Sequence, residues 1–575
     1  MHKVFAELVN KMDFRSELVK AISQAGVEKE LAEKILEVPS ERAMGDFALP
    51  CFKLAAVMKK NPMEIAKEIS AKIKLPKTFS RFEVKGAYIN FFADEGKYAG
   101  EIISALLAEK KVKLKGKSKT IVEYCQANPM KAFHIGHVRN ICLGESIARI
   151  IEESGKKVIR VDYGGDVGPH VSKTIYAYRE LAHEKEPKEL KEKEKWLGEL
   201  YVMGAKAVKD NPALEEKMRE MVVALEKGKD KQLKKDWAYL RKMSLLCFHR
   251  IFKDLGVTFD RIILESEVEK EGIKIAHQLH KEGFAVKDQG ALLVDLTEHG
   301  LEKFLILKSD GAALYSSKDI ALAKLKKNEM KAEISYYVVG GEQAFYFRQL
   351  IKTIELLNNR KQEYCPGVHI SYELVRLEGG KMSSREGNVI TYAELFDEVL
   401  EKTLSETRQR HTDWNEKRIV ETARKLALAA IKFGMVGHDK NKVIVFNWEK
   451  ATSLEGETGP FILYSFARAR SILRKAGKFK APAEIKISTE KEKRLVSVLG
   501  DLDGKITEAR DSSSPHKIAH YLLGLASEFN SFYHEVPVLQ AEKESMASRI
   551  AMVKAVSLAL EKGMGLLNIE MLEEM

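Results

Sequence analysis

The pattern of apolar and polar positions in the first third of the chain predicts a strand, a helix and a second strand in quick succession. Thr120–Tyr124 (TIVEY) is a short β-branched run, typical of a buried strand. Val138–Ser154 repeats apolar residues at helical spacing and is followed by Gly155, a residue type favoured just beyond a helix end. Lys157–Asp162 (KVIRVD) is again strand-like. These elements together predict a parallel βαβ unit.

That unit predicts a doubly wound α/β domain whose ligands bind beyond the carboxyl ends of its strands. Residues 180–250 are rich in Lys and Glu with a helical pattern, so we expect a helical insertion there. The later strand-like segments are Ala291–Leu296, Phe304–Leu307, Tyr336–Val339 and His369–Val375. From Asn415 onward the pattern is almost entirely helical, which predicts a separate all-α domain.

Upstream of the βαβ unit the pattern predicts a small α+β domain. Asn61–Ile73 is helical in pattern, and Arg81–Phe92 (RFEVKGAYINFF) alternates as a half-buried strand does. A lysine-dense connector, Lys110–Lys119, follows, and a solvated linker is favoured there over a nucleic-acid contact. A chain of 575 residues is too long for one core. The expected domains span residues 1–115, 116–450 and 451–575.

Composition narrows the class of protein. A hydrophobic fraction of 45% and a charged fraction of 31% are typical of a soluble globular protein. The longest apolar runs, such as Leu426–Met435 with its Lys432, are too short to span a membrane. Met1–Asp13 lacks the continuous apolar stretch of a secretory signal, so we expect a cytoplasmic protein.

Charge and cysteine usage add two further constraints. The formal net charge of +12 makes a polyanionic partner plausible, although many soluble proteins are equally basic. The five cysteines are scattered without a C-x-x-C pair, which argues against a zinc ribbon and a disulfide framework. We therefore expect no dedicated metal site.

The first candidate site lies where the first strand of the βαβ unit gives way to its helix. The segment Ala127–Arg139 contains the sequence His134-Ile135-Gly136-His137. A helix N-terminus has unpaired N–H groups and the positive end of the dipole, and two imidazoles can donate hydrogen bonds to phosphate oxygens. Gly136 lets a flat base approach the backbone. The alternative is a helix start that contains two histidines by chance.

The second candidate site is the segment Gly379–Asn388 (GGKMSSREGN), in which glycines flank cations and hydroxyls. It precedes Thr391–Glu394, whose Thr-x-x-Glu spacing predicts a capping box at the start of a helix. A mobile loop of this composition can bring Lys381 and Arg385 to a triphosphate as charge develops on the leaving pyrophosphate. The alternative is an ordinary surface loop.

Together the two segments resemble the paired signatures of class I aminoacyl-tRNA synthetases, His-Ile-Gly-His and Lys-Met-Ser-x-x. The spacing leaves room for the insertion that this family carries. Ser384 and Arg385 stand where the family's K-M-S-K-S has Lys and Ser, so Arg385 is a candidate for the second lysine's charge.

Further stretches are similar to arginyl-tRNA synthetases in particular, and they run across nearly the whole chain, most weakly in the insertion. They are Glu123–Asn128, Asp162–Gly168, Leu314–Asp319, Tyr337–Gln343, Gly456–Pro460, Tyr464–Ile472, Pro515–Lys517 and Phe529–Tyr533. The resemblance implies a Rossmann-type parallel-sheet catalytic domain, an N-terminal α+β domain and a C-terminal all-α helical bundle.

The resemblance also implies a binding site for arginine, whose planar cation is best matched by carboxylates. Asp319 and Glu123 would hold the guanidinium, with Tyr315 beside it. Asn128 and Gln343 would hold the α-amino and carboxylate end. From the residues alone, Asp319 is favoured as a helix N-cap, and Tyr315 as a core residue.

For ATP, the resemblance implies catalytic roles for His134 and His137 at the phosphates and for Lys381 at the pyrophosphate. Gly136, Met382, Ser383 and Arg385 complete the expected ATP site. Mg²⁺ would accompany ATP. The implied reaction forms arginyl-adenylate and then passes the arginyl group to the terminal ribose of tRNA, with tRNA required before activation.

The flanking domains would then contact tRNA for arginine. The N-terminal domain, with Gly45–Phe47 and Gly86–Asn90, would touch the tRNA corner, and the C-terminal helices would contact the anticodon stem and loop. Tyr521, Phe529 and Tyr533 are nevertheless expected in the core, because of their helical spacing. We expect a monomer.

Three alternatives remain open on the sequence. One is a class I synthetase for glutamate, cysteine or lysine, although the zinc ligands of a cysteine enzyme are missing. A second is a non-catalytic tRNA-binding relative, against which the intact motif residues argue. A third is a small nucleotidyltransferase with the H-x-G-H loop, whose chains are shorter and lack the helical C-terminal domain.

Overall fold

The computed structural model describes most of the chain. The described residues are 14–37, 39, 44–108, 118–182, 185–228, 230–377, 390–482 and 484–575. The expected positions Lys381, Met382, Ser383 and Arg385 lie outside them, as do Met1–Asp13 and all of the lysine connector before Ser118.

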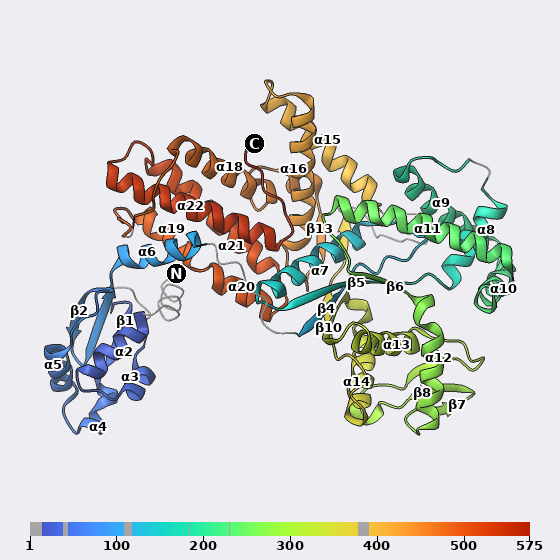
Figure 1. Ribbon diagram of the computed structural model, residues 1–575, viewed down its shortest axis with the longest axis horizontal. Coiled ribbons are helices and arrows are strands. Elements are labelled where there is room, and N and C mark those ends of the chain that lie inside the picture. Colours follow the sequence, from blue (N-terminus) through green and yellow to red (C-terminus); the bar gives the residue numbers. More distant parts are fainter. Residues whose placement is uncertain are drawn as a thin grey trace.

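A five-stranded parallel sheet forms the centre of the molecule (Figure 1). Its strand order is β11-β10-β4-β5-β6, and every neighbouring pair is parallel. The strands are β4 (Lys119–Glu123), β5 (Lys157–Gly164), β6 (Arg261–Leu264), β10 (Ala332–Gly340) and β11 (Gly367–Tyr372). The chain order reverses between β4 and β10, and in doubly wound sheets ligands bind in the crevice at that point.

The predicted βαβ unit is confirmed as β4, α7 (Ile135–Glu153) and β5. The apolar face of α7 is buried, and Gly155 follows the helix at φ 84°, as expected of a residue just beyond a helix end. The helix begins three residues before the expected Val138, because His134 caps it. The two motif histidines therefore belong to the first turn of α7.

The segment expected as an insertion is helical, and it lies at one end of the molecule (Figure 1). Its helices are α8 (Pro169–Glu180), α9 (Leu190–Asp210), α10 (Leu214–Lys227) and α11 (Lys231–Asp254). They enclose a small apolar core of their own around Trp196 and Leu240. The insertion is therefore a packed unit attached to the sheet through both of its ends.

The predicted strands near residues 291 and 304 form a separate antiparallel sheet beside the main one. That sheet contains β7 (Val286–Asp288), β8 (Ala291–Val294) and β9 (Phe304–Leu307), with η3 (Thr297–His299) between the last two. Two helices connect this sheet to the main sheet: α12 (Glu265–Lys281) leads from β6 to β7, and α13 (Tyr315–Asn328) leads from β9 to β10. Within the main sheet, η4 (Gly341–Gln343) and α14 (Ala344–Arg360) connect β10 to β11.

The N-terminal domain corrects one prediction. Arg81–Phe92 is a hairpin of two antiparallel strands that turns at Gly86 (φ 60°), and the expected single strand is wrong. Alternation alone does not reveal the turn, because the side chains keep period two on either side of it. The domain's elements are α2 (Phe14–Gln24), α3 (Lys29–Ile35), β1 (Phe47–Pro50), η2 (Cys51–Leu54), α4 (Ala55–Met58), α5 (Pro62–Lys72), β2 (Phe79–Lys85) and β3 (Tyr88–Ala93).

The C-terminal part is a helical bundle, as expected, and α6 (Glu95–Leu107) joins it to the N-terminal domain by packing on α22 and α19 (Figure 1). Its helices are α15 (Tyr392–Arg410), α16 (Glu416–Val436), α17 (Trp448–Thr452), α18 (Gly459–Ala476), α19 (Glu490–Gly500), α20 (Leu502–Asp511), α21 (His516–Glu535) and α22 (Lys543–Leu566). The exception is a short parallel pair, β12 (Val375–Leu377) with β13 (Ile444–Phe446).

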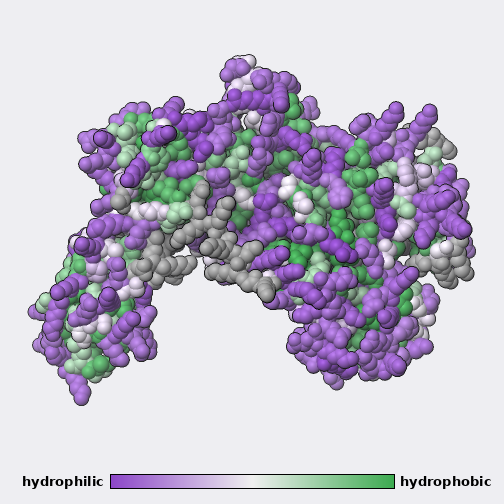
Figure 2. All heavy atoms as spheres, in the orientation of Figure 1, coloured by the Kyte–Doolittle hydropathy of each residue, from purple (hydrophilic) through white to green (hydrophobic). Residues whose placement is uncertain are grey.

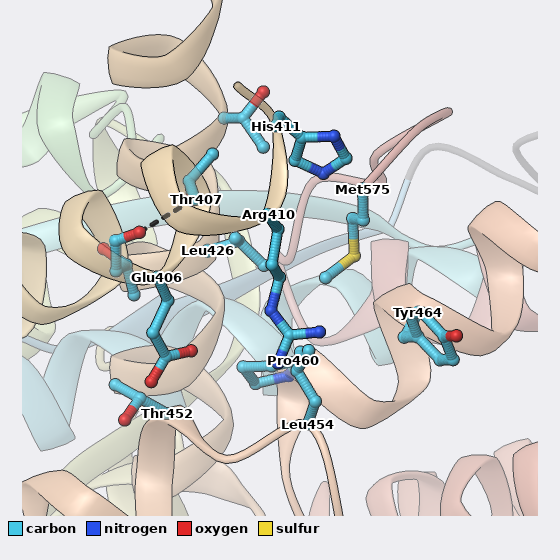
Figure 3. A pocket seen from close by; sticks show the side chains of 12 residues that line it. Glu406, Thr407, Arg410, His411, Leu426, Thr452, Leu454, Pro460, Tyr464 and Met575 are labelled. Atoms are coloured by element: carbon cyan, nitrogen blue, oxygen red, sulfur yellow. Dashed lines mark hydrogen bonds between the residues drawn. The ribbon is translucent and has the colours of Figure 1, made fainter. Parts of the chain in front are cut away.

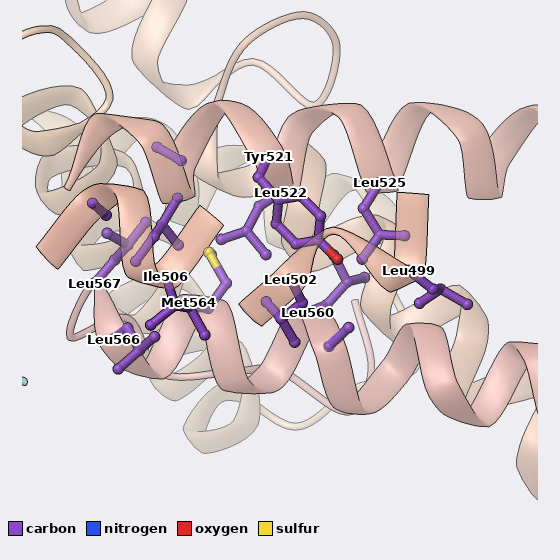
Figure 4. Close-up of a cluster of buried hydrophobic side chains, with 14 of the residues drawn as sticks. Leu499, Leu502, Ile506, Tyr521, Leu522, Leu525, Leu560, Met564, Leu566 and Leu567 are labelled. Carbon is purple, nitrogen blue, oxygen red and sulfur yellow. The ribbon is translucent and has the colours of Figure 1, made fainter. Parts of the chain in front are cut away.

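The bundle core contains two of the three aromatics expected there. Tyr521 and Phe529 are buried, and Figure 4 shows Tyr521 among the leucines between α20, α21 and α22. Tyr533 is 41% exposed, so its placement in the core is wrong. It lies in the last turn of α21, where helical spacing no longer guarantees a covering neighbour.

The outer surface of the molecule is mainly polar. Figure 2 shows one face, on which hydrophilic residues cover most of the unit that contains β7 and β8, while apolar residues appear on the central body. Among the described helices, none combines the length and apolarity needed to cross a bilayer.

Gly144 in the middle of α7 generates a test of the packing between α7 and β4. An added Cβ there would lie 2.3 Å from Cγ of the buried Tyr124. We expect Gly144→Ala to lower the free energy of unfolding by about 1–3 kcal/mol or more, as overpacked cores do. Gly524→Ala in α21 is the control, because nothing lies within 4 Å of its Cβ position. Chemical denaturation that shows equal effects for the two variants would contradict this packing.

Candidate active site

The loop that follows β4 has an unusual backbone. Cys125, Gln126 and Met130 all have positive φ, at 83°, 51° and 68°. Such conformations are costly for non-glycine residues and persist only where surrounding contacts enforce them. Two of these contacts are hydrogen bonds from Cys125 N to Asn140 Oδ1 (2.6 Å) and from Gln126 N to Asp162 Oδ1 (3.0 Å). This strained loop lies at the reversal point of the sheet.

Asn140 holds that loop against the neighbouring strand. Its Nδ2 donates to Gln126 Oε1, to the Val338 carbonyl of β10 and to the Tyr372 hydroxyl, at 2.9 to 3.1 Å. The side chain is buried at 2% exposure. Sequence reasoning missed this residue, although an amide on the apolar face of a predicted helix was a usable signal.

The two motif histidines cap α7 reciprocally. His134 Nδ1 accepts from Gly136 N at 3.1 Å, and His137 Nδ1 accepts from His134 N at 3.1 Å. Their rings stack with centroids 3.8 Å apart. Gly136 has little room for a side chain, since an added Cβ would lie 2.9 Å from the His134 ring.

This geometry fixes the protonation of both rings. Burial lowers the pKa of His134 to about 4, with Lys131 contributing, and burial and the neighbouring His134 lower the pKa of His137 well below its usual range. Because each Nδ1 accepts a backbone hydrogen bond, the proton of each neutral ring lies on Nε2. Both Nε2–H groups are thus donors that remain for a ligand.

The start of α7 also anchors both ends of the segment 378–389. On one side, Arg139 donates to the Leu374 carbonyl at 3.0 Å, just before β12. On the other side, His134 pairs with Thr391, and Ile135 N donates to the Ile390 carbonyl at 3.0 Å. The predicted capping box at Thr391 is confirmed. The described residues on both sides of the second motif therefore contact the helix that begins with the first.

Asp319 lies in the second turn of α13, which begins at Tyr315, so its interpretation as a helix N-cap is wrong. Its carboxylate is partly buried and accepts a hydrogen bond from the Tyr346 hydroxyl of α14. Burial raises the pKa of Asp319 to about 7; the Tyr346 hydrogen bond opposes this, while the charges of Glu123 and Glu265 add to it. A buried carboxyl with so raised a pKa is typical of a functional site.

Glu123, at the end of β4, is buried at 3% exposure and pairs with Lys326. Its Oε2 lies 2.5 Å from Nζ of that lysine, which also donates to Ser335 Oγ and lies 4.1 Å from the centre of the Tyr337 ring. Burial has the largest single effect and would lower the pKa of Lys326, but the charge and hydrogen bond of Glu123, together with Tyr337 and Cys365, raise the pKa overall. Sequence reasoning missed Lys326, one of many lysines in its segment.

Of the remaining expected arginine-site residues, Asn128 and Tyr315 lie near Glu265. Asn128 Oδ1 accepts from Gly165 N at 2.8 Å, and an added Cβ on Gly165 would lie 3.0 Å from both Asn128 Oδ1 and Glu265 Oε1. Tyr315 is 63% exposed, so its interpretation as a core residue is wrong. Gln343 is exposed at the end of η4, and no described contact joins it to the other site residues.

Asp166 fixes the loop after β5. Its carboxylate accepts from Ser266 N, from Ser266 Oγ and from Arg241 of the insertion, at 2.7 to 3.0 Å. The insertion and the start of α12 are thereby tied to the crevice next to Gly165.

The site therefore has two halves. Donors at the start of α7 suit phosphate, and acidic groups between β4, α12 and α13 suit a cation. The loop after β4 leads into the N-terminus of α7 at the point where the strand order reverses. Nucleotide-binding doubly wound folds bind their ligands at the same place.

Comparisons with known proteins agree with this geometry. The family model described as "tRNA synthetases class I (R), catalytic domain" matches residues 101–448. The arginyl-tRNA synthetase N-terminal domain model matches residues 12–93, and the DALR anticodon-binding domain model matches residues 462–575.

Relatives match along the full length. An arginine–tRNA ligase of Clostridium acetobutylicum is 33% identical, covering 98% of this chain and 100% of the relative, and one of Clostridium perfringens is 34% identical at the same coverage. The solved arginyl-tRNA synthetase of Thermus thermophilus is similar at a TM-score of 0.78 and 28% identity, over 98% of this chain and 100% of that one.

The fold and the crevice thus define a class I aminoacyl-tRNA synthetase. Within that class the chain belongs to the arginyl-tRNA synthetase family, and it is accordingly an aminoacyl-tRNA ligase of the arginine type. The alternative of a non-catalytic relative is not favoured.

The reciprocal capping predicts the tautomers of the two histidines. At pH 6, half a unit below the ordinary histidine pKa, we expect His134 and His137 of the free protein to be neutral with protonated Nε2, because both pKa values are lowered. Long-range ¹⁵N–¹H correlation spectra, assigned with His134→Asn and His137→Asn, measure this directly. Imidazolium signals for both rings at pH 6 would contradict the capping geometry.

Proposed function

We propose that this chain activates L-arginine with ATP and transfers the arginyl group to the 3′ end of tRNA for arginine. The arginine carboxylate attacks the α-phosphorus of ATP, pyrophosphate leaves, and the arginyl-adenylate then acylates the terminal ribose hydroxyl. No enzyme nucleophile is needed, so positioning and charge stabilisation supply the rate. As in the family it resembles, activation would require bound tRNA.

The observation that carries this proposal is Asp319. It is a carboxyl without a cationic partner among the described residues, and the nearby acids Glu123 and Glu265 have lysine partners. A guanidinium supplies a planar set of donors and the missing charge. Asp319 and Glu123 would form the acidic side of the arginine site, with Tyr315 beside the side chain and Asn128 and Gln343 at the α-amino and carboxylate end.

For ATP, Nε2 of His134 and of His137 would donate to phosphate oxygens, while Gly136 admits the adenine ring. Lys381, with Met382, Ser383 and Arg385, would contact the phosphates and neutralise pyrophosphate. Mg²⁺ would bind with the ATP phosphates, because this ion is usually held through substrate phosphates and water.

For tRNA, the exposed apolar surface of the N-terminal domain supports a contact with the tRNA corner. Phe52 is 46% exposed, packs edge-on against Tyr88 and lies beside Lys53. Aromatic faces next to cations suit unpaired bases and their phosphates. We propose the domains as residues 1–115 for this contact, 116–450 for catalysis and 451–575 for the anticodon.

At the C-terminal end, an aromatic groove of about 610 Å³ supports anticodon binding. We refer to the surface lined by Trp414, Tyr464, Arg468 and Tyr533 as the aromatic groove. The Arg468 guanidinium lies 4.8 Å and 4.7 Å from the two tyrosine rings. Figure 3 shows the adjoining small cavity, into which Arg410 and the chain end Met575 project. Cation and ring surfaces of this kind stack on single-stranded bases.

We further propose that the protein is a cytoplasmic monomer.

Replacing Asp319 tests the arginine assignment. We expect Asp319→Asn, which keeps the shape and removes the charge, to lower kcat/KM for arginine by about 100-fold or more, as losing one partner of a buried charge pair does. The KM for ATP should stay unchanged. The matched control is Asp511→Asn on an exposed helix end, which should behave as wild type. Charging assays with each amino acid and total tRNA provide the measurement, and equal charging by the Asp319 variant would refute the role.

The aromatic groove generates a separate prediction for tRNA. We expect Tyr533→Ala to raise the KM for tRNA by about tenfold, because a base loses its stacking surface, with little change in kcat. The control is Tyr521→Phe, whose hydroxyl is buried without a hydrogen-bond partner among the described residues. An unchanged KM for tRNA in the Tyr533 variant would exclude the groove from anticodon binding.

A further inference from the structure

A cavity of about 580 Å³ lies where α7, α11 and α16 meet the last residues of the chain (Figure 1). Its lining residue Arg149 belongs to α7, near the opposite end of that helix from the His134 cap. At 1.5 Å per residue, the two residues are roughly 22 Å apart along the helix. The cavity is therefore separate from the crevice that holds the proposed ATP and arginine sites.

The described residues that line this cavity carry more positive than negative charge. They include three acids and five cations, which are Asp254, Glu421, Glu570, Arg149, Lys253, Arg424, Lys425 and Lys432. Each acid already has a cation beside it. Arg424 lies 2.6 Å from Asp254. Lys425 lies 2.5 Å from Glu570 and 3.7 Å from Glu421. The acids of the cavity therefore do not compensate its remaining cations.

Two lysines of the cavity have no carboxylate partner among the described residues. Arg149 is not one of them, because it pairs with Glu145 at 2.7 Å. Lys253 is exposed in the last turn of α11. Lys432 of α16 is only 6% exposed, and its Nζ donates to the Asn568 carbonyl at 2.7 Å. The cavity thus has one uncompensated cation inside and a second at its rim.

Lys432 presents its ammonium group to the cavity. An added Cβ on Gly256, which also lines the cavity, would lie 3.7 Å from Nζ of this lysine. An ammonium has three N–H donors, and the described contacts use one of them. A buried charge without a counter-ion is costly. An anion in the cavity would supply both the missing charge and the missing acceptors.

We propose that this cavity binds a small tetrahedral dianion of the phosphate type, held by Lys432 inside the cavity and by Lys253 at its rim. A dianion compensates both lysines, and its oxygens accept hydrogen bonds from both ammonium groups. A free ion suits the site better than RNA, because a phosphate fixed on a duplex does not readily reach a side chain that is 6% exposed. Since three helices line the cavity, a bound anion stabilises their packing.

The charge of Lys432 gives the site a pH dependence. Burial lowers the pKa of Lys432 to about 8. Charged and titratable groups face this lysine from α7, α11, its own helix and the chain end; they are Cys142, Glu145, Arg149, Lys253, Asp254, Arg424, Lys425 and Glu570. Lys432 is charged below its pKa and loses that charge above it. Sulfate stays a dianion throughout, so its binding should weaken between pH 7 and pH 9.

Calorimetric titration of the full chain with inorganic phosphate, at constant ionic strength, tests the proposal. Lys432→Met keeps the length of the side chain and removes its charge. We expect this variant and Lys253→Met each to weaken phosphate binding by about tenfold or more, as loss of a charge-assisted hydrogen bond does. The matched control is Lys209→Met, an exposed lysine in the last turn of α9, which should bind phosphate as wild type does.

Phosphate can also bind at the histidine cap, and His134→Asn separates the two sites. The proposal requires that His134→Asn keeps the phosphate binding that Lys432→Met and Lys253→Met weaken. Binding that is lost in His134→Asn and unchanged in both lysine variants would overturn it. So would the absence of binding by wild type up to about 10 mM phosphate, which would leave Lys432 as a structural partner of the Asn568 carbonyl.

Two further measurements complete the test. If the lysine variants raise the KM for tRNA and leave phosphate binding unchanged, the surface contacts RNA and the proposal is wrong. Thermal unfolding identifies a variant that does not fold, and phosphate should raise the Tm of wild type more than that of either lysine variant. Should Lys432→Met not fold, the exposed Lys253→Met decides, since unchanged phosphate affinity in that variant contradicts the proposal.

Discussion

The first turn of α7 is the constraint on which the rest of the site depends. Its reciprocal histidine cap satisfies two backbone N–H groups of the helix start from within, so both rings are held neutral with their Nε2–H groups free. The same turn pairs with Thr391, and Arg139 one turn later fixes Leu374. One helix end thus positions the phosphate donors and both flanks of the second motif.

The arginine side depends on that arrangement through the strained loop. The loop runs from Glu123, whose carboxylate pairs with Lys326 of α13, to the histidine cap of α7. Asn140 closes it by holding Cys125 N and the Val338 carbonyl at once. The strained backbone persists because these contacts enforce it. The loop thereby joins the histidine donors at the start of α7 to the acidic residue at the end of β4.

The sequence predicted the elements whose signals are local. The βαβ unit, the helices of the expected insertion, the capping box at Thr391 and the helical C-terminal domain are confirmed. The hairpin at Gly86 was missed, because a strand pair and one long strand share the same alternation. The exposed position of Tyr533 was also missed, since helical spacing says which face a residue occupies and not whether another element covers it.

Sequence analysis predicted only those site residues that lie within recognisable motifs. The histidines and Asp319 stand in recognisable segments, and the resemblance supplied their roles. Lys326, Asn140 and Tyr346 carry no local signal, because their importance comes from which distant residues the fold brings against them. Buried ion pairs across a sheet and a helix are properties of tertiary structure, so the charge balance around Asp319 appears only with coordinates.

A crystal structure with a non-hydrolysable arginyl-adenylate analogue tests the central claim most directly. The account predicts the phosphate oxygens at about 2.7–3.2 Å from Nε2 of His134 and of His137, and the guanidinium on Asp319 with the Glu123–Lys326 pair intact. An analogue bound with its phosphate remote from the α7 cap, or with its guanidinium turned away from Asp319, would contradict it.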